Sequence, residues 1–149
     1  MDNITDTIAI ASDHAGYLMK EFLKENLKTE GFIFKDYGAF SEEPVDYPDM
    51  IHPLAIDIND GIYKRGVIIC GSGNGVAITA NKYPNVRAAV CWEKELVKLS
   101  RQHNDANIIV LPSRFISFKT ALKFVKIFFS TGFDGGRHKR RVEKIPVKL

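Results

Sequence analysis

A glycine-rich loop follows a short apolar run in the stretch Gly66-Val67-Ile68-Ile69-Cys70-Gly71-Ser72-Gly73-Asn74-Gly75. An apolar run of this length, bounded by glycines, is typical of a buried strand in a parallel sheet, and the residues that follow it, 76–80, can open a helix. The loop is therefore predicted to lie at the carboxyl end of a strand, which is where α/β sheets bind their ligands.

The loop also has the chemistry of an anion site. Glycines at alternate positions let backbone N–H groups turn toward one point, and the start of the next helix adds positive potential there. Cys70 would lie beside the anion, where a thiolate is favoured and can act as a base or nucleophile. Two simpler interpretations stay open, Cys70 as a packing residue and the glycines as an ordinary turn. The G-x-G-x-G spacing matches neither a dinucleotide fingerprint nor a P-loop.

Apolar strand-like runs alternate with helical patterns along the whole chain, which predicts one α/β domain over residues 1–149. We expect a three-layer α/β/α sandwich around a largely parallel sheet of about five strands. The expected strands are 8–11, 32–34, 66–70, 86–91 and 107–111. The expected helices include 18–27, 51–62, 93–104 and 118–129.

The composition is that of an ordinary globular protein, with 149 residues, 45% of them hydrophobic and 26% charged. No apolar stretch approaches the roughly 18 residues that a membrane span needs. The two cysteines, Cys70 and Cys91, lie in or beside apolar runs, and the chain has no CxxC pair and no signal peptide, so a reducing cytoplasm is expected. The net charge of +3 is concentrated at residues 137–141, which predicts an anionic partner. Nucleic acid is not expected, because no aromatic platform accompanies these cations.

Polar side chains that follow three of the expected strands are candidates for one binding crevice. Asp13 and His14 follow the first strand, Cys70 and Ser72 the third, and Arg114 the fifth. Because parallel strands end at the same edge of a sheet, these five groups are predicted to face the same space.

His103 has a different setting. It shares a helix face with Leu96, Leu99 and Ser100, at spacings i, i+3, i+4 and i+7. The residue is therefore expected to point inward or toward a partner chain, and a packed core histidine with one hydrogen bond is an equally weighted alternative.

Arg137 and Arg141 are spaced i, i+4, so a helix would present both guanidinium groups to one anion. A solvated basic tail is the commoner explanation of such a run. Gly135 and Gly136 break the preceding structure, and this would let the segment reach a neighbouring subunit.

Six short motifs extend over nearly the whole chain. They are Ser12-Asp13-His14-Ala15-Gly16, Asp46-Tyr47-Pro48-Asp49, Cys70-Gly71-Ser72-Gly73-Asn74-Gly75, Asn81-Lys82, Ser100-Arg101-Gln102-His103-Asn104-Asp105 and Gly135-Gly136-Arg137-His138. Their order, their separations and the chain length resemble the ribose-5-phosphate isomerase B family. The resemblance implies a Rossmann-like sandwich, a homodimer or dimer of dimers with shared active sites, and neither a metal nor a nucleotide cofactor. It also implies that residues 130–149 pack on a partner subunit.

The same resemblance implies a role for each candidate in interconverting D-ribose 5-phosphate and D-ribulose 5-phosphate. Cys70 is the base, Ser72 assists proton movement, and His103 with Asp13 opens the sugar ring. The enediolate is stabilised by the loop backbone, namely Gly71, Gly73, Asn74 and Gly75. The phosphate is held by His14, Arg114, Arg137 and Arg141, and the sugar is contacted by Tyr47 and Asn104.

Ser72 departs from the family's commonest form, which has threonine at this place. Serine keeps the hydroxyl but loses the methyl that restricts its rotamer. Some members use a glutamate a few residues beyond the cysteine position, but Gly75 and Val76 occupy that vicinity here, which leaves Cys70 as the base.

Two other functions remain open from the sequence. One is an isomerase of allose 6-phosphate or galactose 6-phosphate, which would keep the mechanism and change the sugar. The other is a catalytically silent protein that only binds a sugar phosphate, although binding alone would need no base such as Cys70.

Overall fold

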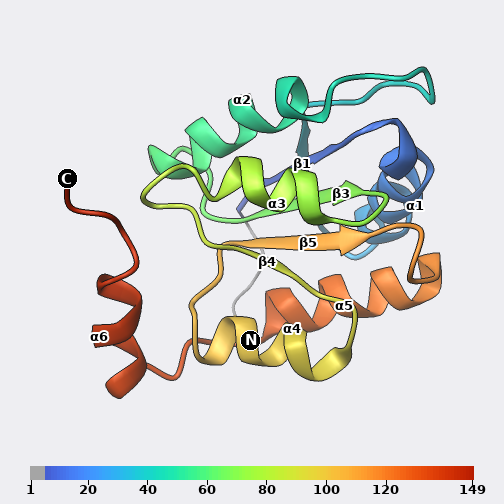
Figure 1. The fold of residues 1–149 in the computed structure, drawn as a ribbon. Helices are drawn as coiled ribbons and strands as arrows, with labels where there is room; N and C mark the ends of the chain where they lie inside the picture. Colours follow the sequence, from blue (N-terminus) through green and yellow to red (C-terminus); the bar gives the residue numbers. More distant parts are fainter. Residues whose placement is uncertain (1–5) are drawn as a thin grey trace.

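The computed structural model describes residues 6–149, and they form a single parallel sheet with helices on both faces (Figure 1). The strands lie in the order β2-β1-β3-β5-β4. Their bounds are β1 (Ile8–Ser12), β2 (Phe34–Asp36), β3 (Gly66–Cys70), β4 (Ala88–Val90) and β5 (Ile108–Pro112). The expected three-layer α/β/α sandwich with five parallel strands is confirmed.

Alternation of side chains along the central strands builds two separate cores. On β3, Val67 and Ile69 pack on one face of the sheet, while Ile68 and Cys70 pack on the other. The first face is covered by α1 (Tyr17–Lys28), α4 (Lys94–Gln102) and α5 (Phe118–Ser130). The second is covered by α2 (Tyr47–Asn59) and α3 (Asn74–Ala80), so Cys70 lies on the α2/α3 face.

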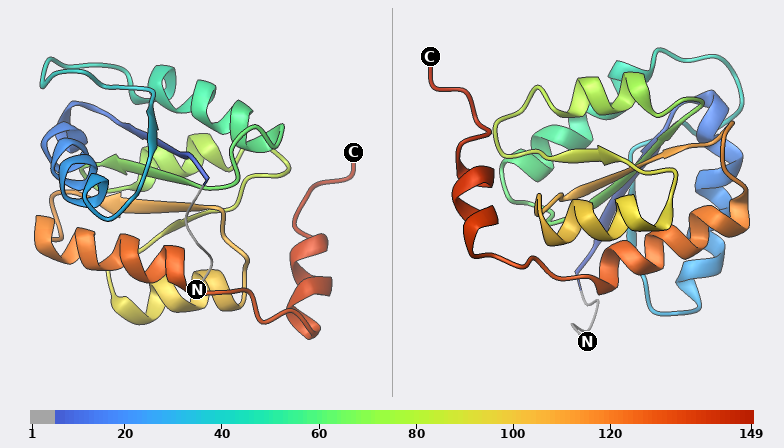
Figure 2. Two further views of the ribbon diagram at one scale, coloured as in Figure 1. Left: turned by 180° about the vertical axis from the view of Figure 1, so that it is seen from behind. Right: turned by 60° about the horizontal axis from the view of Figure 1, so that its bottom comes forward.

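The last helix, α6 (Arg137–Glu143), stands apart from this sandwich. None of its residues is buried, and Figure 2 shows it beside the body of the molecule, reached by an extended segment after α5. Among residues 6–149, no helix combines the length and apolarity needed to cross a membrane.

Several elements differ from the sequence-based expectation. Helix α2 covers Tyr47–Asn59 rather than 51–62, and β4 covers only Ala88–Val90 of the expected 86–91. The second strand is Phe34–Asp36 rather than 32–34, because Phe32 packs into the core before the strand begins and Ile33 is left exposed. The buried face of α4 consists of Val97, Ser100 and Arg101, and not of the predicted stripe through Leu96 and Leu99. Of the predicted stripe, Ser100 is buried, Leu96 and His103 are half-buried and Leu99 is exposed, so the stripe lies at the margin of the buried face.

Candidate active site

Cys70 ends β3 at the carboxyl edge of the sheet, and its thiol receives a backbone hydrogen bond. The Gly73 N–H donates to the Sγ atom at 3.1 Å. Gly73 has φ +79°, and its ideal Cβ position lies only 3.2 Å from Val90, so a side chain there would be both strained and crowded. The loop therefore turns tightly enough to aim its own backbone at the proposed base.

Ser72 lies exposed on the same loop. Its Oγ accepts a hydrogen bond from the Asn74 N–H at 3.2 Å. Two of the loop's N–H groups, those of Gly73 and Asn74, are thus engaged by side chains of the loop itself. The hydroxyl stays accessible to a ligand, because an oxygen that accepts one bond can still donate its hydrogen.

The end of β1 supplies Asp13 and His14. The Asp13 carboxylate caps the turn His14–Gly16 by accepting the Gly16 N–H at 3.0 Å, which is a structural function for this buried residue. His14 Nδ1 accepts the Val45 N–H at 3.2 Å, so a neutral ring carries its proton on Nε2. His14 can therefore donate to an anion from Nε2.

Two further predicted residues border the loop. The Arg114 side chain lies over Gly71, where a Cβ atom would be 3.2 Å from the guanidinium, and the Arg114 N–H donates to the Gly71 carbonyl at 3.0 Å. The Tyr47 ring, at the start of α2, lies over Gly75. We call these residues the Cys70 half-site: Asp13, His14, Tyr47, Cys70, Gly71, Ser72, Gly73, Asn74, Gly75 and Arg114.

The other four predicted residues lie at the opposite edge of the sheet. Helix α4 runs back from the end of β4, so His103 and Asn104 precede the start of β5 at Ile108. Ile108 pairs with Gly66, while Cys70 pairs with Pro112, and strands of this length extend about 13 Å. Figure 1 shows α6, with Arg137 and Arg141, beyond that same edge. We call His103, Asn104, Arg137 and Arg141 the His103 half-site.

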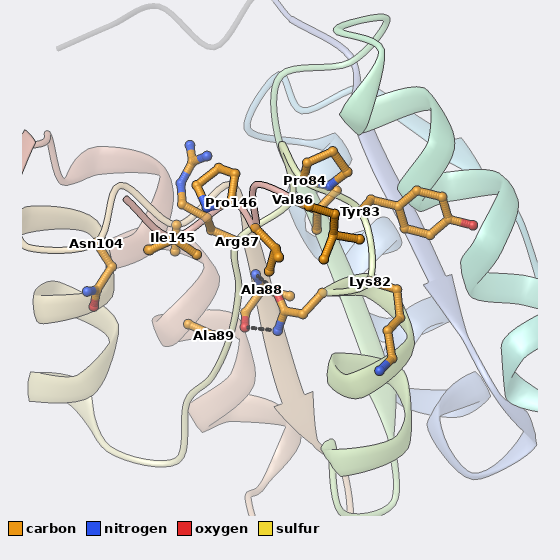
Figure 3. A pocket seen from close by; sticks show the side chains of 14 residues that line it. Lys82, Tyr83, Pro84, Val86, Arg87, Ala88, Ala89, Asn104, Ile145 and Pro146 are labelled. Carbon is orange, nitrogen blue, oxygen red and sulfur yellow. Dashed lines mark hydrogen bonds between the residues drawn. The ribbon is translucent and has the colours of Figure 1, made fainter. Parts of the chain in front are cut away.

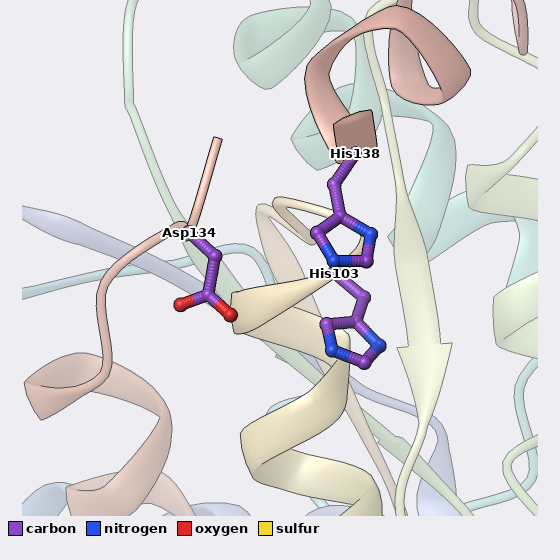
Figure 4. A group of neighbouring side chains, drawn as sticks. All are labelled: His103, Asp134 and His138. Carbon is purple, nitrogen blue, oxygen red and sulfur yellow. The ribbon is translucent and has the colours of Figure 1, made fainter. Parts of the chain in front are cut away.

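A residue outside the predicted set completes this second group. The rings of His103 and His138 stack with centroids 4.1 Å apart and an angle of 11° between planes (Figure 4). No spacing rule brings these two histidines together, since His103 directly follows α4 and His138 lies in the first turn of α6. The stack fixes α6 against α4 and so holds the two arginines near His103.

Asp134 lies close enough to both rings for the three side chains to be candidate metal ligands, with their ligand atoms within 4.8 Å of one another. The surroundings favour an anion instead. Loss of hydration and the nearby charges of His103, Arg137 and Arg141 lower the pKa of His138, and the same arginines would repel a bound cation. The chemistry of the cluster therefore agrees with a phosphate-binding role.

Two cavities adjoin these groups. One, of about 570 Å³, lies between β4 and the C-terminal segment (Figure 3). Asn104 is the only predicted site residue that lines it, and the rest of its wall is largely apolar, so it is not the catalytic pocket. The other, of about 340 Å³, is bordered by Ser72 and Asn74 and by the exposed aromatic rings of Trp92 and Phe115.

Comparison with known proteins gives a consistent result over nearly the full length. Residues 8–145 match the family model described as Ribose/Galactose Isomerase. Ribose-5-phosphate isomerase B of Escherichia coli is 38% identical over 138 residues, covering 93% of each chain. The crystal structure of a Thermotoga maritima ribose 5-phosphate isomerase superimposes with a TM-score of 0.92 at 45% identity, covering 95% of this chain and 98% of that one. The Mycoplasma genitalium ribose-5-phosphate isomerase B with bound ribulose-5-phosphate gives 0.90 at 38% identity, covering 96% and 95%.

Proposed function

The chain belongs to the ribose/galactose isomerase family, and from that premise we propose how its two half-sites carry out one reaction. The enzyme is an aldose–ketose isomerase that interconverts D-ribose 5-phosphate and D-ribulose 5-phosphate. This function is favoured over isomerisation of a hexose phosphate and over silent binding. It belongs to the non-oxidative pentose phosphate pathway.

Proton transfer is assigned to the Cys70 half-site. The Cys70 thiolate removes the proton from C2 of the open-chain aldose, and the resulting thiol returns it to C1 of the enediolate. The Gly73 N–H on Sγ supports this role, because this contact holds the sulfur against the loop backbone before substrate arrives. The Ser72 hydroxyl moves the second proton between O2 and O1, and loop N–H groups stabilise the enediolate oxygen.

Ring opening and phosphate binding need both half-sites. His103 transfers the proton between the ring oxygen and O1, with Asp13 as its acidic counterpart. The phosphate is bound by His14 and Arg114 from one half-site and by Arg137 and Arg141 from the other. Tyr47 and Asn104 contact the sugar hydroxyls.

The observation that carries this proposal is the separation of the two half-sites by the length of a strand. One chain does not bring them together, so we propose a homodimer, or a dimer of dimers, in which each His103 half-site faces the partner's Cys70 half-site. A two-fold axis would then form two identical sites from two chains. The unburied helix α6 and the exposed rings of Trp92 and Phe115 support a partner at these surfaces.

Each step of this mechanism has its own side chain, so we propose no cofactor, and the proposed partners include neither nucleic acid nor membrane. Both cysteines are unpaired and buried, which supports the proposed cytoplasmic location.

Assays of purified protein test the function. We expect formation of ribulose 5-phosphate from ribose 5-phosphate without added metal, and a kcat/KM for allose 6-phosphate at least about tenfold lower. Sedimentation should show a dimer or larger assembly. Turnover of allose 6-phosphate in preference to ribose 5-phosphate, or a monomer that is fully active, would contradict the proposal.

A further inference from the structure

Arg101 is a buried cation that links the two segments of the His103 half-site. It lies on α4 with 3% of its surface exposed. Its Nη1 donates to Asp105 Oδ1 at 2.8 Å and to the Ala106 carbonyl at 2.7 Å, and its Nε donates to the Thr131 carbonyl at 3.1 Å. A single planar group thus joins the loop after α4 to the segment after α5.

These two segments carry the groups assigned to ring opening and phosphate binding. His103 and Asn104 lie within the first, and the second leads through Gly135 and Gly136 to Arg137. Within residues 6–149, one backbone–backbone hydrogen bond also ties the second segment to α4, the Asp134 N–H donating to the Gln102 carbonyl at 3.0 Å. Together with the half-buried stack of His138 on His103, these contacts set the position of Arg137 relative to His103, and those made by Arg101 come from a buried side chain.

The surroundings of Arg101 hold its guanidinium from several sides. Asp105 has φ +45°, an uncommon backbone conformation for a residue other than glycine, and the guanidinium holds its carboxylate from one side. The Phe128 ring lies 5.6 Å below the guanidinium carbon. A buried guanidinium is stable only when its donors are paired, so loss of any one acceptor opposes the arrangement.

We propose that Arg101 is a positioning residue, which sets His103 and the α6 arginines at the spacing that one substrate requires. The inference rests on the proposed function, since His103 and the α6 arginines, which Arg101 positions, are proposed to act in the active site shared with the partner subunit. Fixed placement of reacting and binding groups contributes to rate even when the residue that fixes them never touches substrate.

Arg87 supplies a matched control. Its Nε donates to the Asp105 carbonyl at 2.9 Å, but within residues 6–149 it makes no hydrogen bond to segment 131–136. Arg101→Met should raise the KM for ribose 5-phosphate at least about tenfold and lower kcat, because both segments are released. Arg87→Met should change KM by less than about threefold. Equal KM increases in the two variants would overturn the proposal.

Mixed dimers separate positioning from general stability. Arg101→Met chains refolded with Cys70→Ala chains should regain activity, since one site then joins an intact Cys70 half-site to an intact His103 half-site. Arg101→Met mixed with Arg137→Ala should regain none, because both changes lie in the same half-site. If Arg101→Met folds poorly, Arg101→Lys replaces it, with a smaller increase in KM expected.

A mixture of Cys70→Ala with Arg137→Ala is the positive control. If that pair regains activity and the Arg101→Met pair does not, Arg101 supports the whole fold and the proposal is wrong. If neither pair regains activity despite verified exchange, the shared active site is wrong, and the KM comparison with Arg87→Met then decides the role of Arg101 alone.

Discussion

The Tyr47 ring lies so close over Gly75 that a Cβ atom on this glycine would come within 2.6 Å of the Tyr47 Cζ atom. Gly75 is in the first turn of α3 and Tyr47 is the first residue of α2, so the contact joins the two helices above the Cys70 loop. Glycine is needed here for close approach rather than for an unusual φ. The ring position of a proposed sugar-contacting residue thus depends on a missing side chain.

Gly75→Ala should displace the Tyr47 ring and raise the KM for ribose 5-phosphate. Overpacking of this kind typically costs about 1–3 kcal/mol, so we also expect a measurable loss in urea unfolding. Gly132→Ala is the control, because no atom lies within 4 Å of the added Cβ position there. Equal kinetics for the two variants would show that the Tyr47 ring position is unimportant.

Cys70→Ala should lower kcat by about 10³-fold while substrate affinity changes by only a few fold, because a base contributes mainly in the transition state. Cys91→Ala is a matched control. Burial raises the pKa of the Cys91 thiol to about 12, so this second buried cysteine is not a thiolate at neutral pH. Its variant should keep kcat within a few fold. A parallel loss of binding and rate in Cys70→Ala, measured by calorimetry and turnover, would argue against a base.

Ser72→Ala should lower kcat, and Ser72→Thr should retain it. The hydroxyl is the shared chemical group, and threonine adds only a methyl at an exposed position. The comparison is made at saturating ribose 5-phosphate. Indistinguishable rates for the two variants would mean that the Ser72 hydroxyl takes no part in proton movement.

Much of the fold follows from patterns within short windows. The buried strands β1, β3 and β5 were predictable, because each is a continuous apolar run between loop residues. The edge strand β2 was misplaced, since an edge strand needs no apolar run and here includes the exposed Lys35. Local hydrophobicity indicates that Phe32 is buried. It does not indicate whether Phe32 lies in the strand or before it.

For the candidate site, too, local patterns predicted some positions, but contacts between segments far apart in the sequence could not be predicted. Strand-end positions predicted that Asp13, Cys70 and Arg114 belong to one edge, and the structure brings them there. The stacking of His138 on His103 depends on how the chain returns after α5, which no periodicity encodes. The burial of Arg101 could not be predicted either, because in the sequence of an amphipathic helix a buried arginine cannot be distinguished from a solvent-exposed one.

Stability should depend on the Lys20–Asp36 ion pair, whose Nζ and Oδ2 atoms lie 2.6 Å apart with the lysine side chain fully buried. Burial opposes the Asp36 charge, but hydrogen bonds from Lys20, Lys24 and the Gly38 N–H outweigh it and lower the Asp36 pKa. Asp36→Asn should therefore lower the free energy of unfolding by up to about 3 kcal/mol at pH 7, since it leaves the buried Lys20 with the partly exposed Glu21 carboxylate, at 3.0 Å, as its ion-pair partner.

The stabilising contribution of the Asp36 carboxylate should depend on pH. A carboxylate with a lowered pKa stabilises the folded state above its unfolded pKa, and this contribution is lost as pH falls below about 4. The difference in free energy of unfolding between the wild type and Asp36→Asn, measured with urea, should therefore become smaller as pH falls below about 4. Lys24→Met, which removes a partly exposed partner, should cost less than about 1 kcal/mol. A difference that stays constant from pH 7 to pH 3 would exclude this ionic contribution.

Exchange of subunits between inactive variants tests the shared active site. Arg137 and Arg114 suit this test because both are assigned to phosphate binding. Arg137 belongs to the His103 half-site and Arg114 to the Cys70 half-site, so the two should behave differently when each variant is mixed with Cys70→Ala. Cys70→Ala with Arg137→Ala should regain activity, because each mixed dimer has one site with both native groups. With random pairing of equal amounts, about one quarter of all sites are native.

Cys70→Ala with Arg114→Ala should regain no activity, because every site then carries at least one of the two changes in its Cys70 half-site. The readout is turnover of ribose 5-phosphate after exchange has been verified by mass. Recovery in both mixtures would mean that Arg114 and Cys70 act in different sites. Recovery in neither would mean that Arg137 serves the Cys70 of its own chain, which would require α6 to leave His103 and cross to the opposite edge of the sheet.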